Sequence, residues 1–391
     1  MQKLLIITIT TLFFSCSVNP PSPKPTPAPK PEQKLEQKLE SKPTTGPLAK
    51  IKLPEGFKIE VYADGVDNAR GMSLSPNGTL FVGSRKKGNV YALIDSDKDN
   101  VVDVKHTLIS GLNLPTGVVF KDGDLYIAEV SRIIKFEDIE SKLENPGEPI
   151  VVYDQYPTKS HHGWKYIDFG PDGKLYVPVG APCNVCESED KIFNTITRMN
   201  ADGTDMEIVH NGIRNTVGFT WHPETKDLWF TDNGADWMGD DLPACELNHA
   251  PNDNMNFGFP YCHQGDTPDP KLSEGKDCNA YTPPAQKLGP HTAPLGIEFY
   301  TGNNFPAKYK NQIFIAEHGS WNRKKKIGYR ITLVTLEGNK ATSYTPFAEG
   351  WLNDETDEAW GRPVDMEFLP DGSMLVSDDF GDVVYRIYYE G

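Results

Sequence analysis

The stretch Ser75-Pro76-Asn77-Gly78-Thr79-Leu80-Phe81-Val82-Gly83 joins a tight turn to an apolar run. Asn-Gly supplies the positive φ angles that a hairpin turn needs, and the apolar run after it is typical of a buried strand. Weaker copies of this phrase recur along the chain, at residues 121–128, 171–178, 223–231, 309–317 and 370–377. The sequence therefore contains six units in which a turn precedes a strand.

The spacing of these units predicts the fold. Their turns lie at residues 78, 123, 173, 227, 311 and 372, so successive turns are 45 to 84 residues apart. This spacing matches four-stranded propeller blades with insertions. A β-sandwich also contains such hairpins, but a single sandwich rarely extends over about 300 residues. We therefore predict an all-β chain that folds as a six-bladed β-propeller with four-stranded antiparallel blades.

The N-terminus has the pattern of an export signal. Lys3 precedes eleven residues rich in Leu, Ile, Thr and Phe, a run too short to span a membrane. Ser15-Cys16 resembles the end of a bacterial lipobox, so we expect residues 1–16 to be a signal peptide and Cys16 to carry a lipid. An ordinary exported protein is the alternative. The predicted location is the cell envelope, at the outer membrane or the periplasmic face, with membrane contact only through the lipid.

Residues 17–47 are rich in Pro, Lys, Gln and Glu and contain almost no large apolar side chains. Such a segment cannot bury enough surface to fold, so it is predicted to be a disordered tether. Residues 48–391 then suffice for one large propeller, with no second domain. The formal charge of −16 and the pI near 5.0 argue against nucleic acid as a partner, because phosphate binding needs a basic surface.

Apart from Cys16, the chain has an odd number of cysteines, so at least one thiol has no partner within the chain. Cys183 and Cys186 form a close pair that fits a redox or zinc motif, but no second close pair completes a zinc site. We interpret them as a disulfide, and we pair Cys262 with Cys278. Cys245 is then the unpaired cysteine.

Two connections between the strand phrases carry candidate functional side chains of basic or amide type. Residues 159–164 contain His161 and His162, of which at most one is expected to face the axis. The alternative is a buried, hydrogen-bonded histidine with a structural role only. Residues 211–219 contain Arg214 and Asn215, which suit a carboxylate and a mixed donor-acceptor partner. The alternative is an arginine that only ties two blades together.

Three further segments complete a candidate site. Residues 231–248 combine acidic side chains with Asn and Gly, a set of oxygen ligands that suits calcium, with solvated surface acid as the alternative. Arg323 and Arg362 each lie near Trp and Gly in residues 317–323 and 360–365. Together the connections predict a funnel that holds a polyanionic ring compound against a cation, with a base nearby.

Several of these segments resemble the glucose/sorbosone dehydrogenase family of quinoprotein sugar dehydrogenases. The similarity covers roughly residues 50–390 and is greatest to the sorbosone dehydrogenase branch. It rests on segments that occur in the same order as in the family: His161-His162-Gly163, 170–177, 183–186, Gly212-Ile213-Arg214-Asn215, Thr231-Asp232-Asn233-Gly234, Asp240-Asp241, Glu246-Leu247-Asn248, 256–263, 317–323 and Gly361-Arg362-Pro363-Val364-Asp365.

The resemblance implies a propeller that holds pyrroloquinoline quinone (PQQ) over a calcium ion and oxidises a sugar or sugar aldehyde. A histidine takes the proton of the anomeric hydroxyl while hydride passes to the quinone, and His162 fits this position better than His161. By the same resemblance Arg214, Asn215 and Arg362 hold the cofactor, with Arg323 a weaker candidate. Gly234 and Ala235 match backbone ligands of the calcium, and Glu246 matches a second calcium site.

The chain departs from the family at two positions, and it lacks a haem motif. Ala235 stands where the soluble glucose enzymes of the family have Pro, and Cys245 stands where relatives of the sorbosone branch usually have a residue without a thiol. Cys183-Asn184-Val185-Cys186 is followed by Glu187 instead of His, so electrons must leave to an external acceptor, a quinone or a cytochrome.

Other interpretations of the sequence stay open. A calcium-dependent, lactonase-like hydrolase would use calcium and His162 but has no use for Arg214 together with Arg362. A non-catalytic propeller that binds carbohydrate or protein would use these arginines as salt bridges between blades. Separately, residues 95–103 place acids at several positions of a calcium loop but have His106 where Glu belongs, so a polar hairpin is the alternative.

Overall fold

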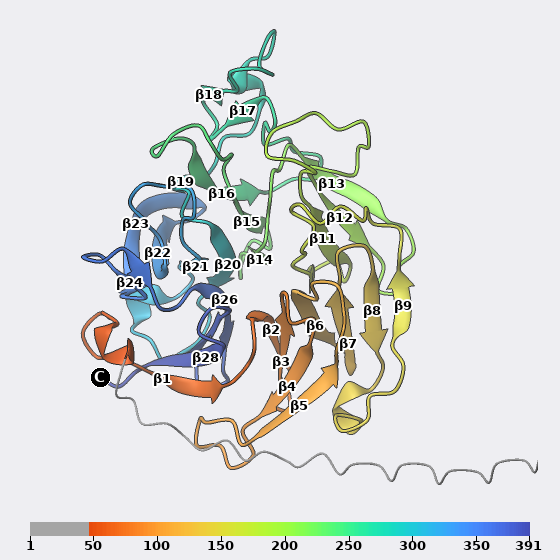
Figure 1. The fold of residues 1–391 in the computed structure, drawn as a ribbon, viewed down its shortest axis with the longest axis vertical. Coiled ribbons are helices and arrows are strands. Elements are labelled where there is room, and N and C mark those ends of the chain that lie inside the picture. Colours follow the sequence, from red (N-terminus) through yellow and green to blue (C-terminus); the bar gives the residue numbers. More distant parts are fainter. Residues whose placement is uncertain (1–46) are drawn as a thin grey trace, which may run out of the picture. The chain divides into compact units, whose positions relative to one another are not determined.

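The structure, a computed structural model, describes residues 47–391. The predicted signal peptide, Cys16 and the tether up to residue 46 lie outside the described residues. Six four-stranded antiparallel sheets follow one another in a ring (Figure 1). The prediction of an all-β, six-bladed propeller is therefore confirmed. No helix in the described part of the chain is long and apolar enough to cross a membrane.

The first three blades each consist of four consecutive strands. From the axis outward, blade one contains β2 (Ala69–Leu74), β3 (Leu80–Ser84), β4 (Val90–Ile94) and β5 (Val104–Ile109). Blade two contains β6 (Gly117–Lys121), β7 (Asp124–Ala128), β8 (Ile133–Phe136) and β9 (Ile150–Tyr153). Blade three contains β10 (Asp168–Phe169), β11 (Leu175–Val179), β12 (Thr195–Met199) and β13 (Glu207–Asn211).

The next two blades keep this order, with one insertion. Blade four contains β14 (Phe219–Trp221), β15 (Leu228–Asp232), β16 (Ala244–Ala250) and β19 (Gln286–Pro290). Blade five contains β20 (Pro294–Phe299), β21 (Ile313–Glu317), β22 (Arg330–Glu337) and β23 (Lys340–Glu349).

Blade six closes the ring by joining the two ends of the described chain. Its inner strands are β26 (Pro363–Phe368), β27 (Met374–Asp378) and β28 (Val383–Tyr389), and its outer strand is the N-terminal β1 (Phe57–Asp64). The pairing of β1 with β28 runs from Phe57 opposite Tyr389 to Asp64 opposite Val383. Opening the ring would therefore expose the edge of β28.

Each of the six turn phrases joins the inner strand of a blade to its second strand. The hydrogen bonds that close these turns include Gly78 N to Ser75 O and Gly173 N to Gly170 O. The phrases predict the blades correctly because a hairpin turn depends on neighbouring residues only.

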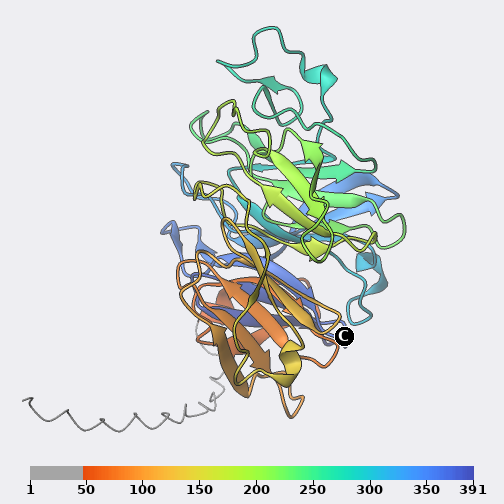
Figure 2. The ribbon, with the colours of Figure 1, turned by 90° about the vertical axis from the view of Figure 1, so that its right-hand side faces the viewer.

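A segment between β16 and β19 stands out from the ring in both views, and Figure 2 shows it at the top. It contains the short hairpin of β17 (Cys262–His263) and β18 (Thr267–Pro268), the 3-10 helix η3 (Cys278–Ala280) and a Cys262–Cys278 disulfide. The remaining elements are β24 (Leu352–Asn353), β25 (Glu358–Ala359) and the 3-10 helices η1 (Pro47–Lys50), η2 (Ile139–Ser141) and η4 (Ala307–Tyr309).

The core is divided among the interfaces between blades. Because side chains of a strand alternate between the two faces, each inner sheet packs against both neighbouring blades. In β3, Leu80 and Val82 pack toward blade six, whereas Phe81 packs toward blade two. Each of the six interfaces has one such apolar cluster.

The inner strands approach one another closely at the axis, and glycine makes this possible. A Cβ on Gly218 would lie 2.1 Å from the carbonyl oxygen of Leu295 in the next blade. Three other glycines meet the following blade in the same way: Gly71, Gly117 and Gly296. The width of the ring therefore depends on the absence of side chains at these positions.

Where blade six meets blade one, carboxylates replace this contact. Asp365 Oδ2 accepts a hydrogen bond from Met72 N at 2.9 Å, and Glu367 Oε2 accepts one from Leu74 N at 3.3 Å. Burial raises the pKa of Asp365 to about 7 and that of Glu367 to about 8. The last blade thus satisfies backbone donors of the first with side chains that burial drives toward the protonated form.

Replacing Gly218 by Ala is expected to destabilise the protein by about 2–3 kcal/mol, because the added methyl meets backbone that cannot rotate away. Urea unfolding followed by circular dichroism measures this. Gly289→Ala is the control, since its Cβ would first meet the side-chain methyl of Thr292 rather than backbone. Equal losses in the two variants would contradict the close approach at the axis.

Candidate active site

A cavity of about 390 Å³ opens at the end of the axis where the inner strands begin. Two sets of segments line it. The first residues of inner strands and the segments leading into them provide Arg70, Arg214, Asn215 and Arg362. The loops between second and third strands provide residues such as Arg85, Gly234, Asp236 and His318. The connections predicted to be functional therefore come together at one end of the ring.

Four arginines give this cavity an excess of positive charge. Arg70 pairs with Asp379 and Arg214 pairs with Asp236, both at 3.0 Å. Arg362 instead donates to the carbonyl oxygens of His318 and Gly319, both at 2.9 Å. Arg85 stacks on a tryptophan ring, with its guanidinium carbon 4.7 Å from the ring centroid. Since neither Arg85 nor Arg362 forms an ion pair within residues 47–391, the cavity suits an anion.

Arg214 is held by a network that crosses from blade three to blade four. Its Nε donates to Asn184 O at 2.9 Å, and its Nη2 donates to Asn184 Oδ1 at 2.7 Å. Asn184 lies inside the Cys183–Cys186 disulfide loop and also exchanges hydrogen bonds with the backbone of Asp236. The guanidinium is therefore fixed before any ligand binds.

The backbone of Arg214 and Asn215 is anchored by one carboxylate. Asp232 Oδ2 accepts from Arg214 N at 2.8 Å, and Asp232 Oδ1 accepts from Asn215 N at 2.6 Å. Asp232 is the last residue of β15, so the end of this strand positions the segment that leads into β14 of the same blade. Burial is the main cause that raises the pKa of Asp232, to about 6.

His162 is buried in the cavity wall with one ring nitrogen engaged. Its Nδ1 lies 3.0 Å from Ala181 O, and because a carbonyl only accepts, Nδ1 carries the proton. Nε2 is then the unprotonated nitrogen. Burial chiefly, with Arg214 and His161 adding to it, lowers the pKa of His162 to about 2. His161 also lines the cavity but is exposed, with its ring centroid 4.1 Å from that of His162.

The structure adds a group that sequence reasoning missed. His318 Nε2 contacts Asp379 Oδ1 at 2.7 Å, and Asp379 also binds Arg70. Burial acts to raise the pKa of Asp379, but His318 and Arg70 outweigh it and hold that pKa well below its usual range. Burial lowers the pKa of His318 to about 4. His318 lies in a segment that resembles the family, whereas Arg70 near the start of β2 and Arg85 and Asp379 in short loops lie outside such segments.

Three polar atoms of the lining residues are buried without a hydrogen-bond partner in the described chain. They are the donor Trp164 Nε1 and the acceptors Asn215 Oδ1 and Asn322 Oδ1. Leaving such atoms unpaired costs about 1–3 kcal/mol each. Together with the arginines, they fit a ligand that carries carboxylates and other polar groups.

Arg323, the weaker candidate for cofactor binding, does not line the cavity. Its Nη1 donates to Asp240 O and lies 3.4 Å from Asp241 Oδ1, so it connects the loops of blades four and five. We therefore leave it out of the ligand set. The Cys183–Cys186 and Cys262–Cys278 disulfides are the pairs expected from the sequence, and Cys245 is a buried free thiol that lines the cavity.

A second, much smaller cavity of about 10 Å³ adjoins the first. Gly234 lines both cavities, and Ala235, Asp232 and Glu246 line the small one. Glu246 is buried, and burial followed by repulsion from Asp232 raises its pKa to about 8. Asn248 Nδ2 donates to Glu246 Oε2 at 3.0 Å, while Asn248 Oδ1 has no partner in the described chain. Two buried carboxylates beside a space of this size suit a cation.

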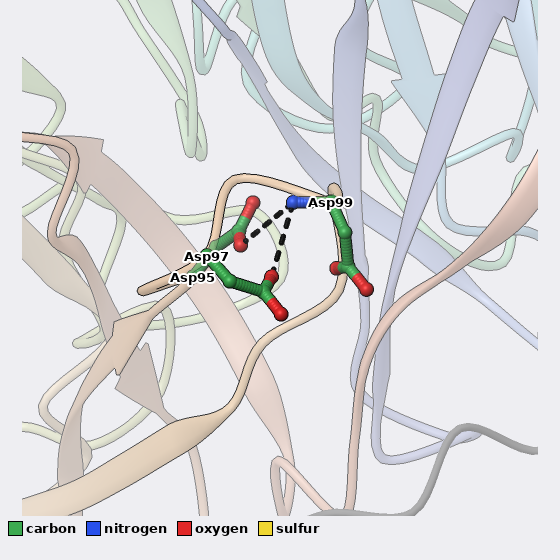
Figure 3. Close-up of side chains that lie close together, drawn as sticks. All are labelled: Asp95, Asp97 and Asp99. Carbon is green, nitrogen blue, oxygen red and sulfur yellow. Dashed lines mark hydrogen bonds between the residues drawn. The ribbon is translucent and has the colours of Figure 1, made fainter.

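The loop of residues 95–103 lies between β4 and β5, on the outer strands of blade one. The carboxylates of Asp95, Asp97 and Asp99 lie within 4.8 Å of one another (Figure 3). Asp99 N donates to both Asp95 Oδ1 and Asp97 Oδ1. His106 is part of β5 and pairs with Ala92. The acids thus already stabilise the turn, and calcium binding there stays a prediction.

The chain was compared with known proteins. The family model TrAA12-like matches residues 51–390. An uncharacterised protein of Borreliella burgdorferi is 34% identical over 357 residues, which cover 87% of this chain and 91% of that protein. A pyrroloquinoline quinone-dependent pyranose dehydrogenase of Coprinopsis cinerea is 22% identical over 414 residues, which cover 87% of this chain but only 55% of that enzyme.

Solved structures share the fold. The PQQ domain of the C. cinerea enzyme, in its holo form, matches with a TM-score of 0.73 and 18% identity, over 86% of this chain and 97% of that domain. A calcium structure of the Trichoderma reesei carbohydrate-active enzyme of family AA12 matches with a TM-score of 0.77 and 20% identity, over 90% and 99% of the two chains. Placement in the sorbosone branch stays a prediction.

Since a cation bound in the small cavity would stabilise the folded protein, removing calcium with EGTA is expected to lower the thermal unfolding midpoint by several degrees. Differential scanning fluorimetry checks this. Glu246→Gln should abolish the calcium effect, whereas Glu148→Gln, at an exposed position, should keep it. A calcium effect that persists in Glu246→Gln would contradict a cation at this cavity.

Proposed function

Since this chain belongs to the TrAA12-like family, we propose that it is a PQQ-dependent dehydrogenase that oxidises a sugar. The observation that carries the proposal is the cavity with four arginines, two of which form no ion pair within the described residues. PQQ, when bound, supplies a quinone that accepts two electrons and presents three carboxylates to these cations. A lactonase-like hydrolase or a simple binding propeller has no need for four arginines at one end of the axis.

The side chains that line the cavity are proposed to bind the cofactor. Arg214, Asn215 and Arg362 are proposed to hold the cofactor, and Arg70 and Arg85 add positive charge that the sequence did not reveal. The unpaired Asn215 Oδ1 and Trp164 Nε1 offer one acceptor and one donor to bound polar groups. Because Arg70 and Arg214 are buried and Arg362 is held by two carbonyl oxygens, little side-chain freedom is lost on binding.

His162 is proposed to be the general base, acting through Nε2. Its hydrogen bond to Ala181 O fixes the tautomer that leaves Nε2 free to take the hydroxyl proton of the sugar. In the protein alone, burial and Arg214 hold the pKa of His162 low. An anionic ligand on Arg214 would offset that cation and raise the basicity of His162 when the site is filled.

Gly234, Ala235 and Glu246 are proposed to hold calcium beside the cofactor. Their support is the small cavity that shares Gly234 with the large one. The electrons are proposed to pass to an external quinone or cytochrome, since the chain has no haem motif. Export and a lipid on Cys16 complete the proposal and rest on the N-terminal sequence alone.

Adding PQQ and calcium to the purified protein is expected to give calcium-dependent binding and reduction of an artificial dye with some member of an aldose panel. Isothermal titration calorimetry measures the binding and absorbance measures the dye. Arg362→Ala should weaken PQQ binding at least about tenfold, because a charged hydrogen-bond donor is lost. Absence of PQQ binding at micromolar concentration would overturn the proposed function.

His162→Gln is expected to keep PQQ binding and to lower kcat by about 10²–10⁴, the usual contribution of a general base. Gln retains a side-chain donor and acceptor but cannot accept a proton at neutral pH. His161→Gln is the matched control and should change kcat little. Loss of turnover in His161→Gln with retention in His162→Gln would assign the base to His161.

A further inference from the structure

Large apolar side chains are exposed around the cavity mouth. The exposed set in the described chain includes Trp237, Leu242, Trp321 and Phe380, all from loops between second and third strands, at the end where the cavity opens. Trp237 is 72% exposed and Trp321 is 63% exposed. Exposed aromatic surface at the mouth of a site is typical of a ligand-binding surface.

The two tryptophans form one unit that spans blades four and five. Their ring centroids lie 5.1 Å apart with an interplanar angle of 85°, so one ring packs edge-on against the other. This arrangement leaves indole faces open to solvent. We call Trp237 and Trp321 the tryptophan platform.

Hydrogen bonds brace the platform on both sides. Next to Trp237, Asp236 Oδ1 accepts from Asn322 Nδ2 at 2.7 Å. Farther out, Arg323 binds the backbone of Asp240. Trp237 also has a φ of 70°, a conformation that a bulky residue rarely adopts. Two loops are therefore locked together in a strained conformation that displays the rings.

The platform adjoins the cavity directly. Trp321, Asn322 and Asp236 line the cavity, and Trp237 follows Asp236 in the chain. Asp236 also pairs with Arg214 at 3.0 Å. The two indole rings therefore lie beside the cavity.

We propose that the tryptophan platform binds a second sugar ring, so that the preferred substrate is an oligosaccharide whose reducing-end ring enters the cavity. This inference rests on the proposed function. The C–H face of a pyranose carries partial positive charge and matches the negative face of an indole ring. Hydroxyl groups at the ring edge would find the carboxylate of Asp236 and the amide of Asn322 nearby.

The surrounding charges favour a neutral glycan over an anionic surface. Asp236, Asp240 and Asp241 flank Trp237 on its own loop, whereas Arg323 and Lys324 to Lys326 follow Trp321 on the other loop, so the platform is surrounded by charges of both signs. A membrane of anionic lipids would be attracted to one loop and repelled by the other. A neutral oligosaccharide pays no such electrostatic penalty.

The test compares glucose with its β-1,4- and α-1,4-linked oligomers of two to five units, titrated into the full-length protein by calorimetry without PQQ. The dissociation constant is expected to fall about tenfold between one and three units for at least one linkage, which corresponds to about 1.4 kcal/mol for one aromatic contact. Trp237→Ala should bring the ratio of the two constants close to one. Trp237→Tyr should retain part of the ratio.

Phe380→Ala is the control, because it removes an exposed aromatic ring from blade six and leaves the platform intact. It should keep the full ratio. A ratio near one in the unaltered protein, or a ratio that Trp237→Ala leaves unchanged, would overturn the platform. If the affinity depends on oligosaccharide length but the protein does not bind PQQ in the separate titration, the proposed dehydrogenase function is wrong and the proposed role of the platform stands. If Trp237→Ala reduces a cytochrome acceptor more slowly and sugar binding is unchanged, the platform is a docking surface for the acceptor, and its proposed role in sugar binding is wrong.

Discussion

The close approach of the inner strands at the axis is the constraint on which the rest of the molecule depends. Backbone meets backbone across neighbouring blades at Gly218 and at three further glycines, so the ring has little room at its centre. Because the inner strands are this close, the segments that lead into them end side by side. Arg70, Arg214 and Arg362 come from three different blades and share one cavity for this reason. The geometry of the site is thus a consequence of backbone packing, and its chemistry is added by loops.

The sign of the charge changes along the axis. In blade six, Arg362 lies at the cavity, Asp365 follows within β26, and Glu367 lies two residues deeper. Burial raises the pKa values of Asp168, Asp365 and Glu367, which shows how unfavourable further negative charge is at that depth. The arginines therefore attract an anion to the cavity, whereas the acidic side chains deeper along the axis disfavour one. The protein as a whole is strongly acidic, so the positive charge of the cavity is local. The cavity attracts an anionic ligand although the net charge of the protein repels it.

The sequence predicted the blades because each turn phrase carries its own conformational preference, and it predicted the disulfide pairs that the structure contains. It did not predict the strand β1 that closes blade six, since pairing with β28 depends on the two ends of the ring meeting. Arg214 and Arg362 were found through their motifs. Arg70, Arg85 and Asp379 were missed because each is a single residue, at the start of a strand or in a short loop, whose neighbours in space lie far away in sequence. Arg323 shares a motif with His318, yet its side chain turns toward Asp240 and away from the cavity, a direction that no sequence pattern specifies.

Asp232 connects the two cavities energetically. Both its carboxylate oxygens accept backbone hydrogen bonds, from Arg214 and from Asn215, and the same side chain lines the small cavity with Glu246. A cation between these carboxylates would stabilise the ionised form of Asp232, and the ionised form is the better acceptor for the two backbone donors. Filling the small cavity would then hold Arg214 and Asn215 more firmly in the large one. By thermodynamic reciprocity, an anion bound to Arg214 would strengthen the binding of the cation. The two proposed ligands, PQQ and calcium, are therefore expected to bind cooperatively through one buried carboxylate at the end of β15.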